Sequence, residues 1–322
     1  MIQLRAVPVD INWQSDMPIY ASEAFLRTVS DEYGWVGGVD EAGQLRCVLP
    51  YTVVRKPGLC MIRFRLETTP LQQELSEAEE QGFLSSVIEH FRSTGADMII
   101  PSGNSALFRT CPPGALAAPY GTYINDLTQS EQVLMGGIRK TYRNNIRRAM
   151  QAKVEIKCGL EYHDVAYELV TDTLKRSGMN FKSYEAFKYT VSSLGDNLKI
   201  FVAEHEGVVQ GCMVAPFSLN TAYNWYSGSR AEPVLGAMHL LHWEGMRHFR
   251  AMGVKRFNFQ GVRIEPEKGS KQEGIMNYKK GFGGQLVQGC MWKYSLHRLK
   301  FAAYSVAIRF LAGNDMQYKS AT

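Results

Sequence analysis

The 322-residue sequence lacks the cysteine patterns that mark metal sites or disulfide frameworks. Its six cysteines are scattered without a CxxC pair or a nearby patterned histidine. No window approaches the roughly 18 uninterrupted apolar residues of a membrane span, and the start MIQLRAVPVDINW does not read as a secretory signal. We therefore expect reduced cysteines, no metal site and a cytoplasmic protein.

The chain as a whole also has only a small excess of charge of one sign. The 36 Lys and Arg residues exceed the 31 Asp and Glu residues only slightly, giving a net charge of +5. Such a small excess argues against a surface that is basic throughout, as in many nucleic-acid-binding proteins. With 45% hydrophobic and 21% charged residues, the composition is that of an ordinary globular protein of one large or two medium domains.

The positive charge is concentrated in one segment, from Glu131 to Glu155. Six cations stand there without an intervening acid: Arg139, Lys140, Arg143, Arg147, Arg148 and Lys153. At helical spacing, five apolar residues share the opposite stripe: Leu134, Ile138, Tyr142, Ile146 and Ala149. The pattern predicts one helix with a cationic front. That front is either a solvated surface or a binding face for a phosphate-rich ligand.

The chain also repeats one order of elements. In the first half, a hairpin around Gly43 is followed by a strand at 61–66, a helix at 71–94 and a strand at 97–100. In the second half, a hairpin around Gly207 precedes the strand TAYNWYSGS, a helix at 236–252 and a strand at 255–259. Corresponding glycines lie 164 (Gly43, Gly207) and 158 (Gly95, Gly253) residues apart. This near-constant offset predicts two copies of one mixed α/β unit.

Three stretches carry a resemblance to a known family: IRKTYRNNIRRAMQAKVEI, YNWYSGS with the helix after it, and GIMNYKKGFGGQLV. The chain resembles the Fem family of aminoacyl-tRNA-dependent aminoacyltransferases and its BioF2-like and GNAT-like acyltransferase relatives. The resemblance implies an α/β (α+β) fold of tandem GNAT-like domains, each a mostly antiparallel twisted sheet flanked by helices. The first domain would comprise residues 1–130 and 291–322, and the second residues 131–290.

The resemblance also bears on the acyl donor. GNAT enzymes that use acetyl-CoA hold its pyrophosphate on a glycine-rich turn before the central helix. The corresponding turn here, 233–238, keeps only Gly236 as a possible donor contact. We therefore expect no bound cofactor and an aminoacyl-tRNA donor, whose activated ester needs neither a metal nor a covalent intermediate.

The same resemblance nominates the site residues. Lys279, within Tyr-Lys-Lys-Gly-Phe, matches the family lysine near the donor's adenosine or the developing oxyanion, although the adjacent Lys280 makes the register ambiguous. Tyr278 offers a stacking surface. Arg143 and Arg147, helped by Lys140, are candidates for gripping the diphosphate of a nucleotide- or lipid-linked acceptor. Their first-half partners would come from four cations: Arg55, Lys56, Arg63 and Arg65.

Other residues allow a functional and a structural interpretation. Tyr223 and Tyr226 either line the cleft or belong to the core. His239 and His242, three residues apart without a third ligand, are weak evidence for a metal. A terminal helix after Gln288 carries an apolar face of Leu296, Leu299, Ala303, Val306, Ala307 and Phe310. We expect it to pack on the first domain, with a peripheral membrane contact as the alternative.

Three functions remain open on the sequence alone. The first is aminoacyl-tRNA-dependent transfer of an amino acid to an amine of a peptidoglycan precursor or another peptide. The second is acyl-CoA-dependent N-acylation of a sugar or polysaccharide precursor. The third is non-catalytic nucleic-acid binding through the basic segment, against which the ordinary net charge argues. The sequence names neither the acyl group, the acceptor, the general base nor the oligomeric state.

Overall fold

The computed structural model describes residues 3–103, 106–311 and 318–320, with the side chains of 309–311 left out. The chain forms two compact units. The first comprises residues 1–13, 20–121 and 288–322, and the second comprises residues 14–19 and 122–287. The main boundaries fall inside the long strands β7 (Leu116–Asp126) and β14 (Gln285–Ser295), whereas the sequence analysis places them at 130/131 and 290/291.

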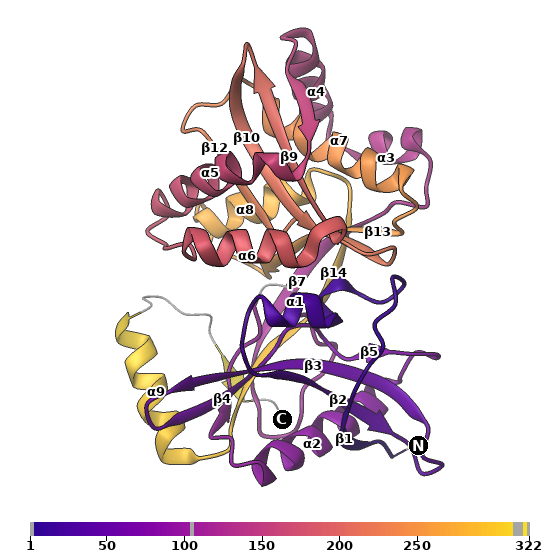
Figure 1. Cartoon of the computed structure of the whole chain (residues 1–322), viewed down its shortest axis with the longest axis vertical. Coiled ribbons are helices and arrows are strands. Elements are labelled where there is room, and N and C mark those ends of the chain that lie inside the picture. Colours follow the sequence, from indigo (N-terminus) through magenta and orange to yellow (C-terminus); the bar gives the residue numbers. More distant parts are fainter. Residues whose placement is uncertain (1–2, 104–105, 312–317, 321–322) are drawn as a thin grey trace. The chain divides into compact units, whose positions relative to one another are not determined.

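The first unit is built on a sheet in which neighbouring strands run in the order β1, β2, β3, β4, β6 and β14 (Figure 1). The pairings β1–β2, β2–β3 and β3–β4 are antiparallel, and β4–β6 is parallel. Short strands β5 and β15 pair with β3 and β7. The strands are β1 (Arg5–Val9), β2 (Tyr33–Val39), β3 (Leu45–Lys56), β4 (Leu59–Phe64), β5 (Thr69–Pro70), β6 (Met98–Ile99) and β15 (Lys319–Ser320).

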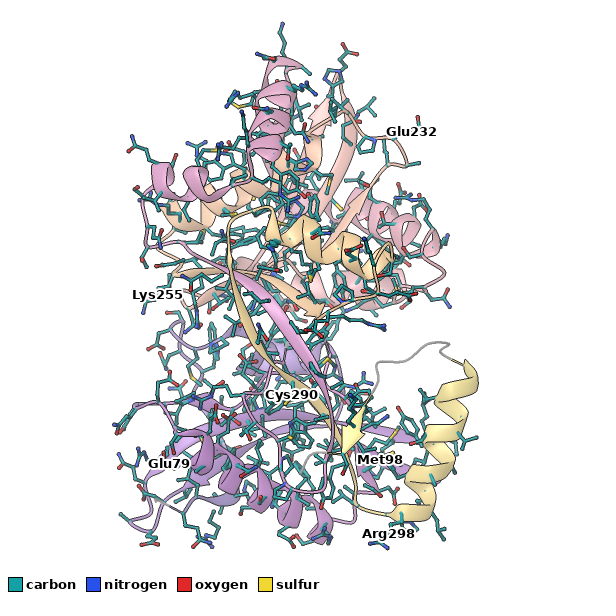
Figure 2. The ribbon with its side chains drawn as sticks, turned by 180° about the vertical axis from the view of Figure 1, so that it is seen from behind. Glu79, Met98, Glu232, Lys255, Cys290 and Arg298 are labelled. Atoms are coloured by element: carbon teal, nitrogen blue, oxygen red, sulfur yellow. The ribbon has the colours of Figure 1, made fainter. Side chains whose placement is uncertain are left out.

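The helices of this unit are α1 (Glu23–Arg27), α2 (Glu77–Ser93) and α9 (Arg298–Leu311). Helix α2 begins later than the predicted 71–94 because Ser76 and Glu79 form a capping box there (Glu79 is labelled in Figure 2). Its buried stripe joins the core of the unit: Phe83, Leu84, Val87, Ile88 and Phe91. The hairpin around Gly43 is confirmed, and Gly43 has φ +81°, a turn conformation that glycine adopts without strain.

Helix α9 packs on the first unit, but not through the predicted face. Phe301 and Tyr304 contact the buried cluster of Met61, Met98 and Ile100 (Met98 and Arg298 are labelled in Figure 2). Leu299 and Val306, expected to be buried, are 79% and 56% exposed. The predicted face was wrong because the helical period alone does not say which of two apolar stripes meets the sheet. The side chain of Phe310, also expected on that face, lies outside the described residues.

The second unit contains two groups of strands. In one group, neighbouring strands run in the order β7, β13 and β11. In the other group, the order is β12, β10, β9 and β8. The pairings β8–β9, β9–β10 and β10–β12 are antiparallel, and β11–β13 is parallel. This is the pairing order of the first unit. The strands are β8 (Glu155–Cys158), β9 (Leu198–His205), β10 (Val208–Pro216), β11 (Thr221–Tyr223), β12 (Tyr226–Ser229) and β13 (Arg256–Arg263).

Helices cover both faces of the four-stranded sheet. Successive residues of β10 point to opposite faces. Cys212 Sγ lies against the Ala166 carbonyl of α5, and Met213 lies against Gly245 of α7. The helices of this unit are α3 (Glu131–Gly137), α4 (Lys140–Gln151), α5 (His163–Lys175), α6 (Tyr184–Leu194), α7 (Ala237–Ala251) and α8 (Lys271–Lys280). The predicted helix at 236–252 and the hairpin around Gly207 are confirmed.

The stretch TAYNWYSGS is not one strand. Residues 221–223 pair with β13, and residues 226–229 pair with β10. The change occurs at Asn224 and Trp225, whose backbone N–H groups donate to Asn258 of β13 and Val214 of β10 respectively. The two sheets of the second unit therefore part within this stretch, and α7 follows directly after it.

The basic segment is two helices and not the single predicted one. Helix α3 ends at Gly137, and Ile138 and Arg139 have the extended ψ angle of 135°. Arg139 N–H donates to the carbonyl oxygen of Gly281 (2.8 Å), and the Arg143 guanidinium donates to the carbonyls of Gly136 and Ile138. The apolar stripe still faces inward, since Leu134, Ile138, Ile146 and Ala149 are buried. Tertiary hydrogen bonds therefore replace the helical ladder at the break.

Candidate active site

Lys279 lies in the last turn of α8, beside β13. Its Nζ donates to the carbonyl oxygens of Gln260 (3.0 Å) and Gly261 (2.9 Å). The side chain is partly buried, and this burial lowers the pKa of Lys279 to about 8. Because an ammonium has three N–H donors, two are used by these carbonyls. The third can meet an oxygen that develops negative charge during a reaction.

The backbone of Gln260 is in an uncommon conformation at this point. Its φ is +65°, in the left-handed region that non-glycine residues rarely adopt, at a cost of about 1–3 kcal/mol. Asn258 helps to hold it, because the Asn258 Oδ1 accepts from the Gln260 N–H at 2.7 Å. The conformation presents the Gln260 carbonyl to Lys279. Strain of this kind is concentrated at functional sites in proteins.

A buried hydrogen-bond network around His242 lies where the two sheets of the second unit separate. His242 on α7 is 1% exposed, and its Nδ1 lies 2.7 Å from the Met238 carbonyl oxygen. Because a carbonyl only accepts, Nδ1 carries the proton and Nε2 accepts, from Asn224 Nδ2 (3.0 Å) or the Ser227 hydroxyl (3.3 Å). Burial lowers the pKa of His242 to about 4. The imidazole is therefore neutral, and it ties α7 to the residues where the strand changes sheets.

Tyr278 precedes Lys279 and joins this network. Its hydroxyl lies 3.2 Å from His242 Nδ1, and burial raises its pKa, so the phenol stays neutral. Its ring packs among other aromatic rings, with Tyr142 at 5.8 Å and Phe282 at 5.3 Å between centroids. His239 lies 4.3 Å from Tyr142, and burial lowers the pKa of His239 to about 4. The predicted pair Tyr278 and Lys279 is thus brought together with two histidines of α7.

Gly236 begins α7 with φ +89°. A Cβ built on it would lie 2.0 Å from the Asn145 carbonyl oxygen of α4. An amide group on either side of it is already engaged, because Ala237 N–H donates to the Val234 carbonyl and Val234 N–H donates to Gln210 Oε1 (3.1 Å). The glycine is thus required where α4 packs against α7. Its role as a donor contact stays a prediction.

The predicted phosphate-binding cations differ in how exposed they are to solvent and in the hydrogen bonds they already make. Lys140 and Arg147 are exposed, and Arg147 donates to Asn144 Oδ1 at 3.1 Å. Arg143 is half-buried and holds the carbonyls at the end of α3. Its geometry favours a structural role over a diphosphate grip, while Lys140 and Arg147 present their charge to solvent. Sequence spacing could not separate these roles, because the break between α3 and α4 depends on the distant residue Gly281.

The two predicted tyrosines of TAYNWYSGS also differ in their solvent exposure. Tyr223 is 3% exposed, which favours the core interpretation. Tyr226 is partly exposed and stacks on Trp225 at 4.5 Å, with the Lys182 ammonium 5.9 Å from its ring centre. Neither Asn224 nor Ser227 was nominated from the sequence. The only available signal was an asparagine in the middle of an otherwise β-forming run, a residue type depleted in strands.

Two of the four first-unit cations, Arg55 and Arg65, make hydrogen bonds or an ion pair with nearby residues. Arg55 forms a two-bond ion pair with Glu32 (2.6 and 2.9 Å), and Arg65 Nε donates to Thr52 Oγ1 at 2.8 Å. Arg63 is partly buried, and burial lowers its pKa. Lys56 is exposed. Phosphate binding by these residues stays a prediction.

Two further properties concern the described part of the chain. No group of three or more His, Cys, Asp or Glu side chains there is placed to hold a metal ion. Within the same residues, no helix has both the length and the apolar character that crossing a bilayer requires.

Comparisons with known proteins agree with this architecture. The model of the Acetyltransferase (GNAT) domain family matches residues 136–280. The structure is similar to that of FemX, with a TM-score of 0.65 at 13% identity over 88% of this chain and 94% of the other. It is also similar to the C-terminal domain of a putative lysylphosphatidylglycerol synthetase from Agrobacterium fabrum (TM-score 0.52, 13% identity, 92% and 98% covered).

A tandem GNAT protein from the clavulanic acid biosynthesis pathway is a third similar structure, with a TM-score of 0.51 at 11% identity over 91% of this chain and 98% of the other. A comparison with curated proteins gives no match. The predicted mixed α/β class and tandem GNAT-like fold are confirmed by these structures and by the pairing order shared by the two units.

Proposed function

For a chain that contains a GNAT acyltransferase domain on a tandem GNAT fold, we propose aminoacyl transfer from a charged tRNA to an amine of a phosphate-bearing peptide precursor, in the cytoplasm. The similar structures of FemX and of the lysylphosphatidylglycerol synthetase domain support an aminoacyl donor. A peptidoglycan precursor, nucleotide- or lipid-linked, is the acceptor we favour.

The observation that carries this proposal is the state of the α7 N-terminus. A pyrophosphate needs free backbone N–H groups at such a helix end. Here Val234 and Ala237 N–H already have protein acceptors, and the Asn145 carbonyl oxygen closes on Gly236. A carbonyl oxygen repels an anion. Two N–H groups of this turn are therefore taken up by protein contacts, which makes the turn less suited to the CoA pyrophosphate than an open glycine-rich turn, while an aminoacyl ester on tRNA makes no such demand.

Lys279 supplies the chemistry in this proposal. The acceptor amine attacks the ester carbonyl and a C–N bond forms. The ester C–O bond then breaks, and the ribose oxygen leaves as a hydroxyl by taking the proton that the attacking nitrogen loses. The third N–H of the Lys279 ammonium stabilises the oxyanion that appears between these events. The two backbone carbonyls that hold Lys279 preorganise its position, so little reorganisation is needed in the transition state.

The exposed cations of α4 support binding of a polyanion. Lys140, Arg147 and Arg148 are exposed, and none of them forms an ion pair among the described residues. Each phosphate contact made by such a residue adds to the salt dependence of binding. The basic face therefore fits the tRNA backbone or the phosphates of the acceptor.

The second candidate is an acyl-CoA-dependent N-acyltransferase acting on a sugar or polysaccharide precursor. It is favoured by the description of the matching family as an acetyltransferase domain. The two candidates differ in the donor, so the donor separates them.

We would titrate the protein with charged tRNA and with acetyl-CoA by calorimetry at several salt concentrations. The proposal predicts tRNA binding that weakens steeply with salt, and weak or absent acetyl-CoA binding. Micromolar acetyl-CoA binding with no affinity for charged tRNA would select the CoA-dependent candidate.

A further inference from the structure

The position of the Lys279 ammonium depends on a short piece of main chain in β13. Its Nζ lies 3.0 Å from the Gln260 carbonyl oxygen and 2.9 Å from the Gly261 carbonyl oxygen, and both of these residues are buried. Gln260 has the left-handed φ of +65°, which a glutamine keeps only where its surroundings hold it there. The contact that holds Gln260 therefore also holds Lys279.

Asn258 supplies that contact. Its Oδ1 accepts from the Gln260 N–H at 2.7 Å and from the Thr122 hydroxyl of β7 at 2.6 Å. Because a main-chain N–H only donates, the side-chain atom that it meets is the oxygen, and this fixes the orientation of the Asn258 amide. An asparagine that accepts from the N–H two residues later forms an Asx-turn, which stabilises a local bend of the main chain. A leucine at 258 would fill a similar space without offering an acceptor.

Asn258 also lies where the strands of the second unit separate. It is the last residue of β13 that pairs with β11, opposite Tyr223, and its carbonyl oxygen accepts from the Asn224 N–H at 2.9 Å. After Asn224 the chain turns to pair with β10. Strand β11 therefore does not extend as far as Gln260, and the Asn258 side chain supplies the acceptor for the Gln260 N–H.

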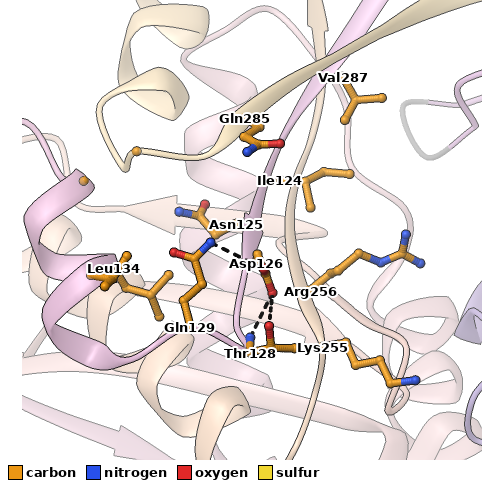
Figure 3. A pocket seen from close by; sticks show the side chains of 13 residues that line it. Ile124, Asn125, Asp126, Thr128, Gln129, Leu134, Lys255, Arg256, Gln285 and Val287 are labelled. Atoms are coloured by element: carbon orange, nitrogen blue, oxygen red, sulfur yellow. Dashed lines mark hydrogen bonds between the residues drawn. The ribbon is translucent and has the colours of Figure 1, made fainter.

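A second polar residue of β7 holds the main chain that follows Lys279. Asn125 Nδ2 donates to the Phe282 carbonyl oxygen at 2.9 Å, and the Phe282 N–H donates to the Lys279 carbonyl oxygen at 3.2 Å. Figure 3, a close view of the neighbouring cavity, labels Asn125 beside Asp126 where β7 ends. Strand β7 thus supports the acceptors of the ammonium through Thr122 and the chain that carries it through Asn125.

We propose that Asn258 is a positioning residue of the reaction. It acts through Gln260 and not by contact with a substrate: it stabilises the left-handed main chain whose two carbonyls fix the direction of the Lys279 ammonium. The catalytic part of this inference rests on the proposed function, in which the third N–H of Lys279 meets the oxyanion. The positional part rests on the main-chain geometry alone.

The first test compares substitutions of Asn258 in the full chain, with charged tRNA and a nucleotide-linked muramoyl peptide as substrates. Asn258→Leu should lower kcat about 10–100-fold and change the KM of the peptide less than about twofold, because the ammonium is misplaced in the transition state. Asn258→Asp keeps an oxygen acceptor and should stay within about threefold of the natural kcat. The matched control is Asn197→Leu, which removes another half-buried asparagine bonded to a main-chain carbonyl and should leave kcat unchanged.

Glycine at position 260 separates positioning from packing. Glycine takes a positive φ without strain and alanine does not, although both remove the glutamine side chain. Asn258→Leu combined with Gln260→Gly should therefore be roughly tenfold more active than Asn258→Leu combined with Gln260→Ala. Thermal unfolding shows that each variant is folded, and Asn258→Ala, which also lacks the acceptor, replaces Asn258→Leu if the leucine variant is not. Equal activity of the two double variants would overturn the inference, and so would a natural kcat in Asn258→Leu.

Crystal structures of the same variants test the positional part without any reaction. In Asn258→Leu, residue 260 should leave the left-handed region and Lys279 Nζ should lose at least one of its two carbonyl contacts. The glycine double variant should restore both. An unchanged φ at 260 with both contacts kept in Asn258→Leu would overturn the inference whatever the kinetics. A natural protein that forms no amide from charged tRNA would overturn the proposed function instead, and the crystal structures would then decide the inference.

Discussion

The two units pair their strands in the same order but differ at one strand. In the first unit, β4 pairs along its length with β3 and also pairs with β6. In the second unit, the corresponding strand is divided into β11 and β12, which belong to different sheets. His242, Asn224 and Ser227 occupy the division, and Lys279 lies on the adjoining β13 carbonyls. The same pairing order thus gives one continuous strand in the first unit and, in the second, a divided strand with polar side chains at the division.

The largest effect should come from Lys279, because the proposed function assigns the oxyanion contact to its ammonium, beside the divided strand of the second unit. Lys279→Met keeps the length of the side chain but removes the ammonium, so turnover should fall about 10²–10³-fold, as when a preorganised oxyanion donor is lost. The adjacent Lys280 is exposed and supplies the matched control Lys280→Met. Steady-state kinetics of both variants checks this. Equal losses in the two variants would remove Lys279 from the chemistry.

A substitution of Asn224 should destabilise the place where TAYNWYSGS passes from β11 to β12. Asn224→Ala removes a donor from buried His242 and should lower the free energy of unfolding by about 2 kcal/mol. The control Asn144→Ala lies on α4 outside the network and should change stability by less than about 0.5 kcal/mol. Urea unfolding measures both. If the two variants were equally stable, the network would not be holding the division.

Acid should destabilise the second unit more than the first. His242 has its pKa lowered from 6.5 to about 4, so between these values the unfolded chain binds more protons than the folded one. Stability therefore falls as pH drops from 6.5 to 4, by about 2 kcal/mol at pH 5 for this residue alone. His239, with a pKa of about 4, adds to the loss in the same window.

Hydrogen exchange followed by mass spectrometry at pH 7 and pH 5, corrected for the intrinsic rates, resolves this by unit. Peptides from α7 and β12 should lose more protection than peptides from α2 and β4. In His242→Asn the additional loss should be smaller. Uniform loss across both units would contradict the sign or the location of the effect.

The smallest effect concerns the basic face. Arg147→Ala should weaken binding of tRNA about threefold to tenfold and reduce the salt slope by about 1, because an exposed phosphate contact is lost. Arg143→Ala should instead lower the melting temperature, since Arg143 holds carbonyls between α3 and α4. Filter binding and thermal unfolding separate the two outcomes. A large salt effect in Arg143→Ala without loss of stability would return Arg143 to phosphate binding.

Local signals in the sequence predicted the repeat well. The hairpin glycines Gly43 and Gly207 both have positive φ, a requirement that the turn imposes whatever lies elsewhere in the chain. The helix at 236–252 followed from its apolar period. Lys279 was reached through a resemblance, and the structure separates it from Lys280 by burial.

Features that depend on distant partners were missed. The break between α3 and α4 is fixed by Gly281, some 140 residues away, and the division of TAYNWYSGS is fixed by strands on either side of it. The exposed face of α9 could not be distinguished from its packed face by periodicity. The His242 network lacks any linear motif, because its members come from α7 and from the strand change before it.

The most direct test of the central claim follows amide formation from two donors in parallel. The protein is given a lysine-containing, nucleotide-linked muramoyl peptide with either tRNA charged with labelled amino acids or labelled acetyl-CoA, and mass spectrometry follows label in the peptide. The account predicts label from tRNA, lost in Lys279→Met and kept in Lys280→Met. Label from acetyl-CoA alone, or from tRNA with Lys279→Met fully active, would contradict it.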